Sequence, residues 1–309
     1  ARDRSAQRAA AAPETTQTIR KDASEGGGED AMKIIEILYA VLMGIVEGIT
    51  EWLPISSTGH MILLDRLFTM DFSKNFTEMF QVVIQLGAIL AVVVVFFRRL
   101  NPFAPSKSSA EKKRTWVLWS KVVVGMIPAM VAGVLLKKLY GSIPDNPFLI
   151  AGALIVYGVA FIVIERLHRG KSYRIESADD LSYKDAFAVG CFQALAVIPG
   201  TSRSGSTIIG GMLAGVSRTA AAEFTFFMAI PVMAGASLIE VLGFIKDGIV
   251  PSSAEWGVLI IGIIVAFAVS LAVIRFLMDF VKKHSFESFG WYRIVLGIVV
   301  IIYFAINAA

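Results

Sequence analysis

The stretch EGITEWLPISSTGH, residues 47–60, places two carboxylates, a proline and a run of hydroxyl side chains inside an otherwise apolar part of the chain. An apolar segment at residues 34–53 leads into it, and a second short apolar stretch follows at about residues 61–70. A helix, a polar break and a short return helix describe a re-entrant hairpin, which a membrane tolerates where protein or a cavity surrounds the break. This stretch therefore predicts a hairpin that enters and leaves the bilayer on one side.

The stretch PGTSRSGST, residues 199–207, interrupts the chain a second time in the same way. The apolar segment before it, residues 184–198, is too short for a full span, and a short apolar stretch follows at about residues 208–215. GIVE leading to PISS in the first half parallels GCFQ leading to PGTS in the second half, and the glycines that open these runs, Gly44 and Gly190, differ by 146 in number. The sequence therefore predicts a second hairpin and an internal repeat.

The composition is that of a membrane protein. Of the 309 residues, 56% are hydrophobic and 17% are charged, against roughly 45–50% and about 25% in soluble domains. The mean hydropathy is +0.68. The apolar residues fall into blocks of about 20, enough to cross ~30 Å of hydrocarbon. Six blocks predict full spans, at residues 77–97, 116–138, 147–165, 222–245, 256–278 and 289–307.

These elements predict an all-α polytopic membrane protein with six transmembrane helices plus two re-entrant helical hairpins. A hairpin adds no crossing, so each half of the chain, about residues 34–165 and about residues 184–307, has three spans. Because three is odd, the halves are expected to form an inverted repeat whose breaks meet near the middle of the bilayer. We expect residues 32–309 to form a single transmembrane catalytic domain. Residues 1–31, which are polar and rich in Ala, Glu and Gly, are expected to be a disordered tail or fusion remnant.

The net charge of +4 comes from basic residues grouped in short loops between apolar blocks, which indicates membrane topology and no nucleic-acid partner. The basic loops are residues 98–114, 166–184 and 279–288, and an inverted repeat puts all three on one side of the membrane. The positive-inside tendency makes that side cytoplasmic. The chain ends and the first break are then expected to face the extracytoplasmic side, although Lys137 and Lys138 lie on the wrong side for this rule.

Glu47 and Glu51 are four residues apart, so they lie on one face of the expected helix. Two carboxylates at membrane depth cost roughly 2.5–3.5 kcal/mol each on insertion scales. They need a cation, a shared proton or water, and we interpret them as groups that bind a metal or transfer protons. A structural pair that caps nearby backbone is the alternative.

The proline and hydroxyl side chains that follow favour the start of a new helix. The N–H groups of its first turn would attract phosphate, with Ser56 and Thr58 beside them as substrate-binding groups. Ser57 and His60 are three residues apart and could share a face, as a hydroxyl and the group that exchanges its proton. A polar turn with satisfied hydrogen bonds is the alternative.

The second break surrounds Arg203 with hydroxyl side chains and glycines. A guanidinium is always charged and its planar fork matches phosphate oxygens in two-point contact, while glycines let backbone amides approach an anion closely. Arg203 is therefore expected to hold phosphate, and a structural ion pair with Glu47 or Glu51 is the alternative. Gln193 stands at the repeat position of Glu47 and is expected to line the same cavity. The other residues expected to bind substrate here are Gly200, Thr201, Ser202, Ser204 and Thr207.

With these two motifs, the sequence resembles the undecaprenyl-diphosphate phosphatases, the bacitracin-resistance membrane protein family. The resemblance runs through residues 32–309. It implies a bacterial plasma-membrane enzyme, surrounded by membrane lipids, that converts undecaprenyl diphosphate to undecaprenyl phosphate. Such an enzyme recycles the lipid carrier of peptidoglycan synthesis in cell wall biogenesis and confers bacitracin resistance. The resemblance also implies a divalent cation, Mg or Ca, at the two acids, and an active set of Glu47, Glu51, Ser57, His60 and Arg203.

Three points stay open from the sequence. In one mechanism Ser57 attacks the terminal phosphorus while His60 or Glu51 takes its proton. In the other, a water bound to the cation attacks and Ser57 serves as a ligand. Inverted repeats with broken helices are also a transporter design, so a lipid-phosphate flippase or an anion transporter is the alternative function. The oligomeric state, including a homodimer, is open as well.

Overall fold

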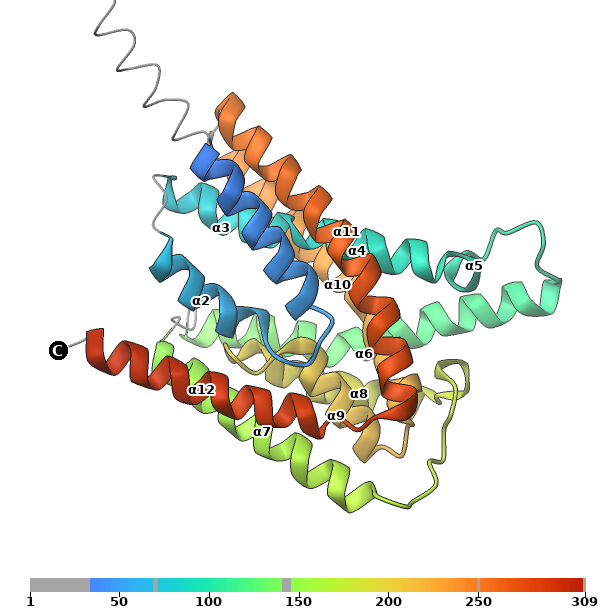
Figure 1. Cartoon of the computed structure of the whole chain (residues 1–309). Helices are drawn as coiled ribbons and strands as arrows, with labels where there is room; N and C mark the ends of the chain where they lie inside the picture. Colours follow the sequence, from blue (N-terminus) through green and yellow to red (C-terminus); the bar gives the residue numbers. More distant parts are fainter. Residues whose placement is uncertain (1–33, 69–71, 141–145, 249–250, 308–309) are drawn as a thin grey trace, which may run out of the picture.

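The computed structural model describes residues 34–68, 72–140, 146–248 and 251–307. Within these ranges the regular structure is helical, apart from one isolated bridge between Ile175 and Val216. The tail predicted at residues 1–31 lies outside the described residues. Figure 1 shows the arrangement of the helices. In chain order they are a helix over residues 34–50, α2 (Ser57–Leu67), α3 (Lys74–Val83), α4 (Gln85–Val95), α5 (Phe97–Leu100), α6 (Ser109–Tyr140), α7 (Pro147–His168), η1 (Ala178–Asp180), α8 (Tyr183–Ala194), η2 (Leu195–Val197), α9 (Arg203–Leu213), α10 (Arg218–Lys246), α11 (Ser253–Lys283) and α12 (Glu287–Asn307).

Six helical segments of the described chain are long and apolar enough to cross a membrane, which confirms the six predicted spans. The first of them is not one continuous helix, because α3 ends at Val83 and α4 begins at Gln85, with Ile84 between them. The six segments are Asn75–Val95, Ser109–Leu136, Pro147–His168, Arg218–Lys246, Ser253–Lys283 and Glu287–Asn307.

Two further segments each consist of a helix, a break and a short return helix. We call residues 51–56, between the helix 34–50 and α2, the first break, and residues 198–202, between η2 and α9, the second break. The return helices begin at Ser57 and Arg203, several residues before the apolar stretches at about residues 61 and 208, and the start at Ser57 confirms the helix start expected from the proline and hydroxyl side chains. The hydroxyl-rich motifs themselves form the first helical turns, because a serine at the end of each break caps the helix.

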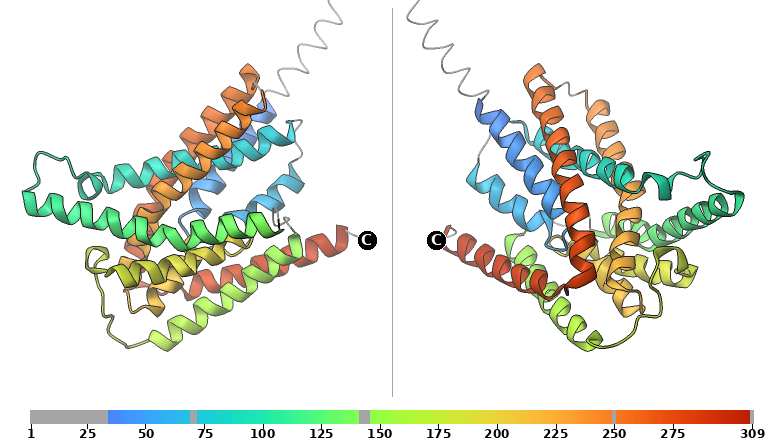
Figure 2. Two further views of the ribbon diagram at one scale, coloured as in Figure 1. Left: turned by 180° about the vertical axis from the view of Figure 1, so that it is seen from behind. Right: turned by 45° about the vertical axis from the view of Figure 1, so that its right-hand side comes forward.

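Glycines let the helices α7 and α12 pack closely. α7 and α12 run side by side in Figures 1 and 2, and they touch at Gly158 and Gly290. A Cβ atom added to either glycine would lie 2.7 Å from the carbonyl oxygen of the other. Small residues at a contact are the usual way for helices to associate in a membrane, where no hydrophobic force drives them together. This pair supports the face of α12 that reaches the two breaks.

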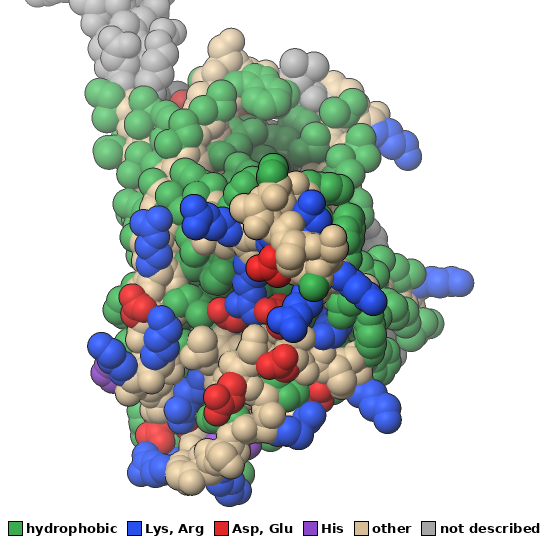
Figure 3. Space-filling model, turned by 90° about the vertical axis from the view of Figure 1, so that its right-hand side faces the viewer, with side chains coloured by type: hydrophobic (Ala, Val, Ile, Leu, Met, Phe, Trp, Pro, Cys, Tyr) green, Lys and Arg blue, Asp and Glu red, His purple; other side chains and the backbone are tan. Residues whose placement is uncertain are grey.

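The three basic loops come together at one end of the molecule. Arg99 pairs with Asp179 at 3.2 Å and with Glu223 at 2.7 Å, and Arg169 pairs with Glu287 at 3.1 Å. These ion pairs join residues from the loops 98–114, 166–184 and 279–288, or from the helix ends beside them, as the topology predicts. Lys and Arg side chains gather on the face seen in Figure 3. In Figure 1 the C-terminus and the start of the helix 34–50 lie at the opposite end.

We expect Gly290→Ala to destabilise the fold, because its methyl group would meet the Gly158 carbonyl oxygen at 2.7 Å. Overpacking of this kind costs about 1–3 kcal/mol, and it should lower the melting temperature of the detergent-solubilised protein. The control is Gly133→Ala in α6, where an added Cβ meets nothing within 4 Å. Equal melting temperatures of the two variants would contradict this packing.

Candidate active site

The two breaks share one local geometry. Ser56 has φ 75° and Ser202 has φ 70°, and within the described ranges these are the two non-glycine residues with positive φ. Each serine is the N-cap of its return helix, and its side chain accepts a hydrogen bond from the backbone N–H of Gly59 or Gly205, at 3.4 Å and 3.2 Å. A non-glycine residue at positive φ is uncommon, and such strained positions cluster at functional sites.

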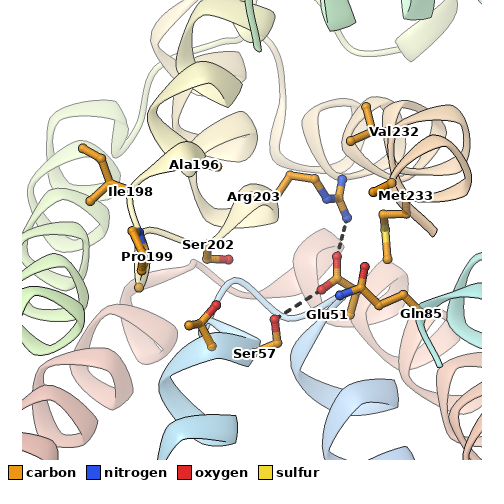
Figure 4. Close-up of a pocket in the computed structure, with 13 residues that line it drawn as sticks. Glu51, Ser57, Gln85, Ala196, Ile198, Pro199, Ser202, Arg203, Val232 and Met233 are labelled. Carbon is orange, nitrogen blue, oxygen red and sulfur yellow. Dashed lines mark hydrogen bonds and ion pairs between the residues drawn. The ribbon is translucent and has the colours of Figure 1, made fainter. Parts of the chain in front are cut away.

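A cavity of about 240 Å³ lies where the breaks face each other. Its wall is polar on the side of the two helix starts and apolar on the side of α10 and the second break (Figure 4). Helix N-termini carry partial positive charge and unpaired N–H groups, so this placement suits an anion. The lining residues are Glu51, Ser57, Thr58, Gln85, Ala196, Ile198, Pro199, Gly200, Ser202, Arg203, Val232, Met233 and Ala236.

An ion pair crosses this cavity from one break to the other. Arg203 Nη2 donates to Glu51 Oε1 at 2.9 Å, and the Ser57 hydroxyl donates to Glu51 Oε2 at 3.4 Å. Figure 4 shows these three side chains pointing toward one another. Arg203 also donates through Nη1 to the Thr225 carbonyl oxygen at 3.1 Å, which fixes its guanidinium from the side of α10. Of the two acids, Glu51 is the one that pairs with Arg203, and the expected role of Arg203 in holding phosphate stays a prediction.

The sequence that carries this ion pair is similar to known proteins over most of its length. Residues 40–299 match the family described as Bacitracin resistance protein BacA. This chain belongs to the BacA family. The undecaprenyl-diphosphatase of Enterococcus faecalis is 54% identical over 278 residues, which cover 89% of this chain and 100% of that protein. Those of Limosilactobacillus fermentum (50% over 275 residues, 89% and 100%) and Streptococcus mutans (52% over 273 residues, 88% and 97%) are similar.

Among the predicted site residues of this BacA-family chain, His60 is directed away from Ser57. Its Nδ1 lies 2.8 Å from the Ser56 carbonyl oxygen, and its Nε2 lies 2.7 Å from the Tyr292 hydroxyl. The carbonyl oxygen can only accept, so Nδ1 carries the proton and Nε2 accepts from the tyrosine. The hydroxyl of Ser57 instead donates to Glu51, and His60 is absent from the cavity lining. In this arrangement Glu51 is the group placed to take the Ser57 proton.

Glu47 is buried one turn before Glu51 and does not line the cavity. Its Oε1 has no hydrogen-bond partner, although Glu51 and Arg203 lie within electrostatic reach. No group of three or more His, Cys, Asp or Glu gathers within the described ranges. Mg²⁺ is commonly held by one or two carboxylates together with substrate phosphates. The unpartnered carboxylate oxygen of Glu47, one turn from the cavity-lining Glu51, fits that ligand set.

Some of the remaining predicted residues line the cavity, and others are buried outside its lining. Thr58, Gly200 and Ser202 line it, and their role in binding substrate stays a prediction. Ser204 donates to the Leu53 carbonyl oxygen at 3.5 Å and so ties the second break to the first. Buried positions outside the lining are held by the side chains of Ser56, Thr201, Thr207 and Gln193.

Two of these buried groups differ sharply in how they are satisfied. The Thr207 hydroxyl donates to the Arg203 carbonyl oxygen at 2.9 Å and accepts from Thr225 at 2.8 Å. By contrast, neither the amide nitrogen nor the amide oxygen of Gln193 has a hydrogen-bond partner. Most buried polar side-chain atoms in folded proteins have a hydrogen-bond partner, so these atoms are exceptions. Gln193 therefore resembles Glu47 in its surroundings as well as in its repeat position.

Four residues of the site were missed by the sequence analysis. Gln85 lines the cavity from the start of α4, and Thr225 holds Arg203 from α10. Tyr292 binds His60, and its neighbour Arg293 reaches the carbonyl oxygens of both breaks. Arg293 could have been found, because an ionisable residue inside the expected span 289–307 is itself a functional signal. The other three carry no mark in the sequence that separates them from ordinary helix residues.

The strain at the second cap gives a stability prediction. Ser202→Ala loses the capping oxygen and keeps a Cβ at φ 70°, and such a loss costs about 1 kcal/mol. Ser202→Gly loses the same oxygen but relieves the positive φ, so it should cost only a few tenths. Thermal melting in detergent should rank the wild type and Ser202→Gly above Ser202→Ala. The geometry described here is refuted if Ser202→Gly melts below Ser202→Ala.

Proposed function

We propose that this chain hydrolyses undecaprenyl diphosphate to undecaprenyl phosphate and inorganic phosphate. The observation that carries the proposal is the set formed by Arg203, Glu51 and Ser57, which face one cavity at the starts of two helices. That set offers a cation, a base and a hydroxyl to a phosphate. The relatives named undecaprenyl-diphosphatase are about half identical to this chain over nearly all of it, which supports the same substrate.

The first task of the site is to hold charge. Arg203 and the N–H groups at the starts of α2 and α9 would bind the phosphate oxygens, and they would stabilise the charge that moves to the leaving phosphate. The apolar side of the cavity, which includes Ile198, Val232 and Met233, is suited to the start of the polyprenyl chain. Because the guanidinium is fixed by Thr225, little reorganisation is needed when the substrate enters.

The second task is the transfer itself. In the mechanism that the geometry favours, the Ser57 oxygen bonds to the terminal phosphorus and Glu51 takes its proton. The bond from that phosphorus to the bridging oxygen breaks, and undecaprenyl phosphate leaves. Water then attacks the phosphoserine and releases inorganic phosphate. The rival mechanism has water attack the substrate directly, with Ser57 holding a phosphate oxygen.

Glu47 and Glu51 would hold a divalent cation, Mg²⁺ or Ca²⁺, and the unpartnered Oε1 of Glu47 supports this assignment. When bound, such a cation would neutralise phosphate charge. Arg203 pairs with Glu51 at 2.9 Å, and Glu47 lies within electrostatic reach of both groups. In this mechanism His60 would hold the backbone of the first break in place, because its ring Nδ1 donates a hydrogen bond to the Ser56 carbonyl oxygen.

We also propose how the chain lies in the membrane. The two breaks belong to re-entrant hairpins in an inverted repeat, because Ser56 and Ser202 have the same φ and the same capping bond. The basic loops gather at one end, which the positive-inside tendency assigns to the cytoplasm. The cavity is then expected to open to the extracytoplasmic side of the bacterial plasma membrane. There the enzyme would recycle the carrier lipid for peptidoglycan synthesis and confer bacitracin resistance.

The proposal is tested by phosphate release from undecaprenyl diphosphate by the purified protein in detergent. Release by the wild type that is abolished in Arg203→Ala supports hydrolysis. Movement of the lipid across vesicles without phosphate release would support the flippase or transporter alternative, which the named relatives do not favour.

We expect Arg203→Lys to lower kcat/KM by about 10²–10³-fold, because an ammonium group keeps the charge but loses the fork that matches phosphate oxygens. The matched control is Arg218→Lys, which removes a guanidinium that donates to Glu165 at 2.8 Å beside the basic loops. That control should stay within about threefold of the wild type. Equal losses in both variants would show that the effect is general and not local to the cavity.

The choice of nucleophile has its own test. If Ser57 attacks, Ser57→Ala should lose about 10³-fold or more in kcat, and rapid acid quenching of the wild type should trap a phosphoserine visible by mass spectrometry. Thr58→Ala removes the neighbouring hydroxyl of the same cavity and should leave the phosphoserine at Ser57 detectable. Substantial turnover by Ser57→Ala would favour direct attack by water.

A further inference from the structure

Arg293 is a charged side chain that the proposed mechanism does not use. It lies on α12, and none of its surface is exposed. No carboxylate pairs with it anywhere in the part of the chain that the structure describes. Burying a cation without a counter-charge is expensive, so such a group is retained only where its charge or its hydrogen bonds have a task.

All of its hydrogen bonds go to backbone carbonyl oxygens. Nη1 donates to Pro54 at 3.2 Å, and Nη2 donates to Gly200 at 3.0 Å and to Thr201 at 2.8 Å. A longer bond, 3.5 Å, runs from Nε to Leu154 on α7. One guanidinium therefore holds the first break with one end and the second break with the other.

Two of these carbonyl oxygens, those of Pro54 and Gly200, belong to equivalent positions of the two breaks. Pro54 stands two residues before the capping serine of the first break, and Gly200 stands two residues before the capping serine of the second. In each case the return helix begins with the next residue after the cap, and these first residues are Ser57 and Arg203. The distance between the Ser57 hydroxyl and the Arg203 guanidinium thus depends on the hydrogen bonds that Arg293 makes to both breaks.

The orientation of the peptide groups follows from the same bonds. The C=O and N–H of a trans peptide point to opposite sides, so a carbonyl drawn to Arg293 directs the following N–H away from it. The Thr201 carbonyl oxygen is held in this way, and the following N–H belongs to Ser202, which lines the cavity. Arg293 also lies 5.4 Å from the Tyr157 ring centre, so its position is fixed from behind as well.

We propose that Arg293 is a positioning residue for the phosphatase reaction, which bridges the two breaks and sets the placement of Ser57 against Arg203. This inference rests on the proposed function. A lysine cannot reproduce the bridge, because a single ammonium group lacks the planar fork that reaches carbonyl oxygens on two sides. The role requires the shape of the guanidinium in addition to its charge.

The first experiment compares Arg293→Lys with Arg218→Lys, the latter being a part-buried arginine that pairs with Glu165 and contacts neither break. Melting temperature, kcat and KM are measured in detergent with undecaprenyl diphosphate, well below the melting temperature of each variant. We expect Arg293→Lys to lose about 100-fold in kcat, the usual effect of a 1 Å misplacement, with KM within about threefold of the wild type. Arg218→Lys should keep its kcat, whatever it loses in melting temperature.

A second variant perturbs the bridge without removing it. A Cβ atom at Gly205 would lie 3.0 Å from Arg293 Nη1, so in Gly205→Ala the guanidinium must shift by a few tenths of an ångström. We expect its kcat to fall by about tenfold or more at unchanged KM. Gly133→Ala adds the same methyl group where nothing lies within 4 Å and should match the wild type. If Arg293→Lys does not fold, the comparison of Gly205→Ala with Gly133→Ala tests the positioning role of Arg293.

Three results overturn the inference. The first is a folded Arg293→Lys with wild-type kcat, and the second is a wild-type kcat for Gly205→Ala. The third is an equal loss of kcat in Arg218→Lys at an equal loss of melting temperature, which would make the effect one of stability alone. If the wild type itself releases no phosphate, the proposed function fails first, and that outcome is distinct from an active wild type with an active Arg293→Lys.

Discussion

The structure depends on the need to compensate charge away from water. Glu51 and Arg203 belong to breaks 152 positions apart in the chain, and each would be costly alone among apolar helices. Their contact at 2.9 Å removes much of that cost, and it is available only when the two breaks face each other. The helices that carry the breaks are in turn placed by close packing, as at Gly158 and Gly290. Charge compensation and helix packing therefore favour the same arrangement.

The same ion pair explains how the resting site avoids premature chemistry in the proposed mechanism. Arg203 is occupied by Glu51, and Glu51 accepts the Ser57 hydroxyl only at 3.4 Å. A phosphate that competes for the guanidinium would weaken the hold of Arg203 on the carboxylate and make it a better acceptor for the serine proton. The base thus becomes more effective as the substrate binds.

The sequence reveals the parts of this design that are local in the chain. Blocks of about 20 apolar residues are enough to predict six spans, and motifs rich in proline, serine and glycine are enough to predict two helix starts. The pairing of Glu51 with Arg203 is also foreseeable, because few cations lie at membrane depth. The partners of His60 are not, because spacing suggests Ser57 while the ring in fact binds Tyr292, 232 positions away. Residue spacing gives the face of a helix, but long-range packing decides which neighbour that face meets.

The two breaks end in the same kind of serine cap, with φ 75° at Ser56 and 70° at Ser202, but they divide the chemistry between them. Positions that differ by 146 in number hold Ser57 and Arg203, and likewise Glu47 and Gln193. The first break and the helices that flank it thus contribute the acids and the hydroxyl, and the second break with its flanking helices contributes the cation and a neutral amide. The carboxylate of Glu51 and the guanidinium that balances it therefore come from different halves of the chain. Arg293 completes the arrangement, because it binds equivalent carbonyl oxygens of both breaks through the two arms of one side chain. The division of charge that suits a phosphate is therefore also what holds the halves together.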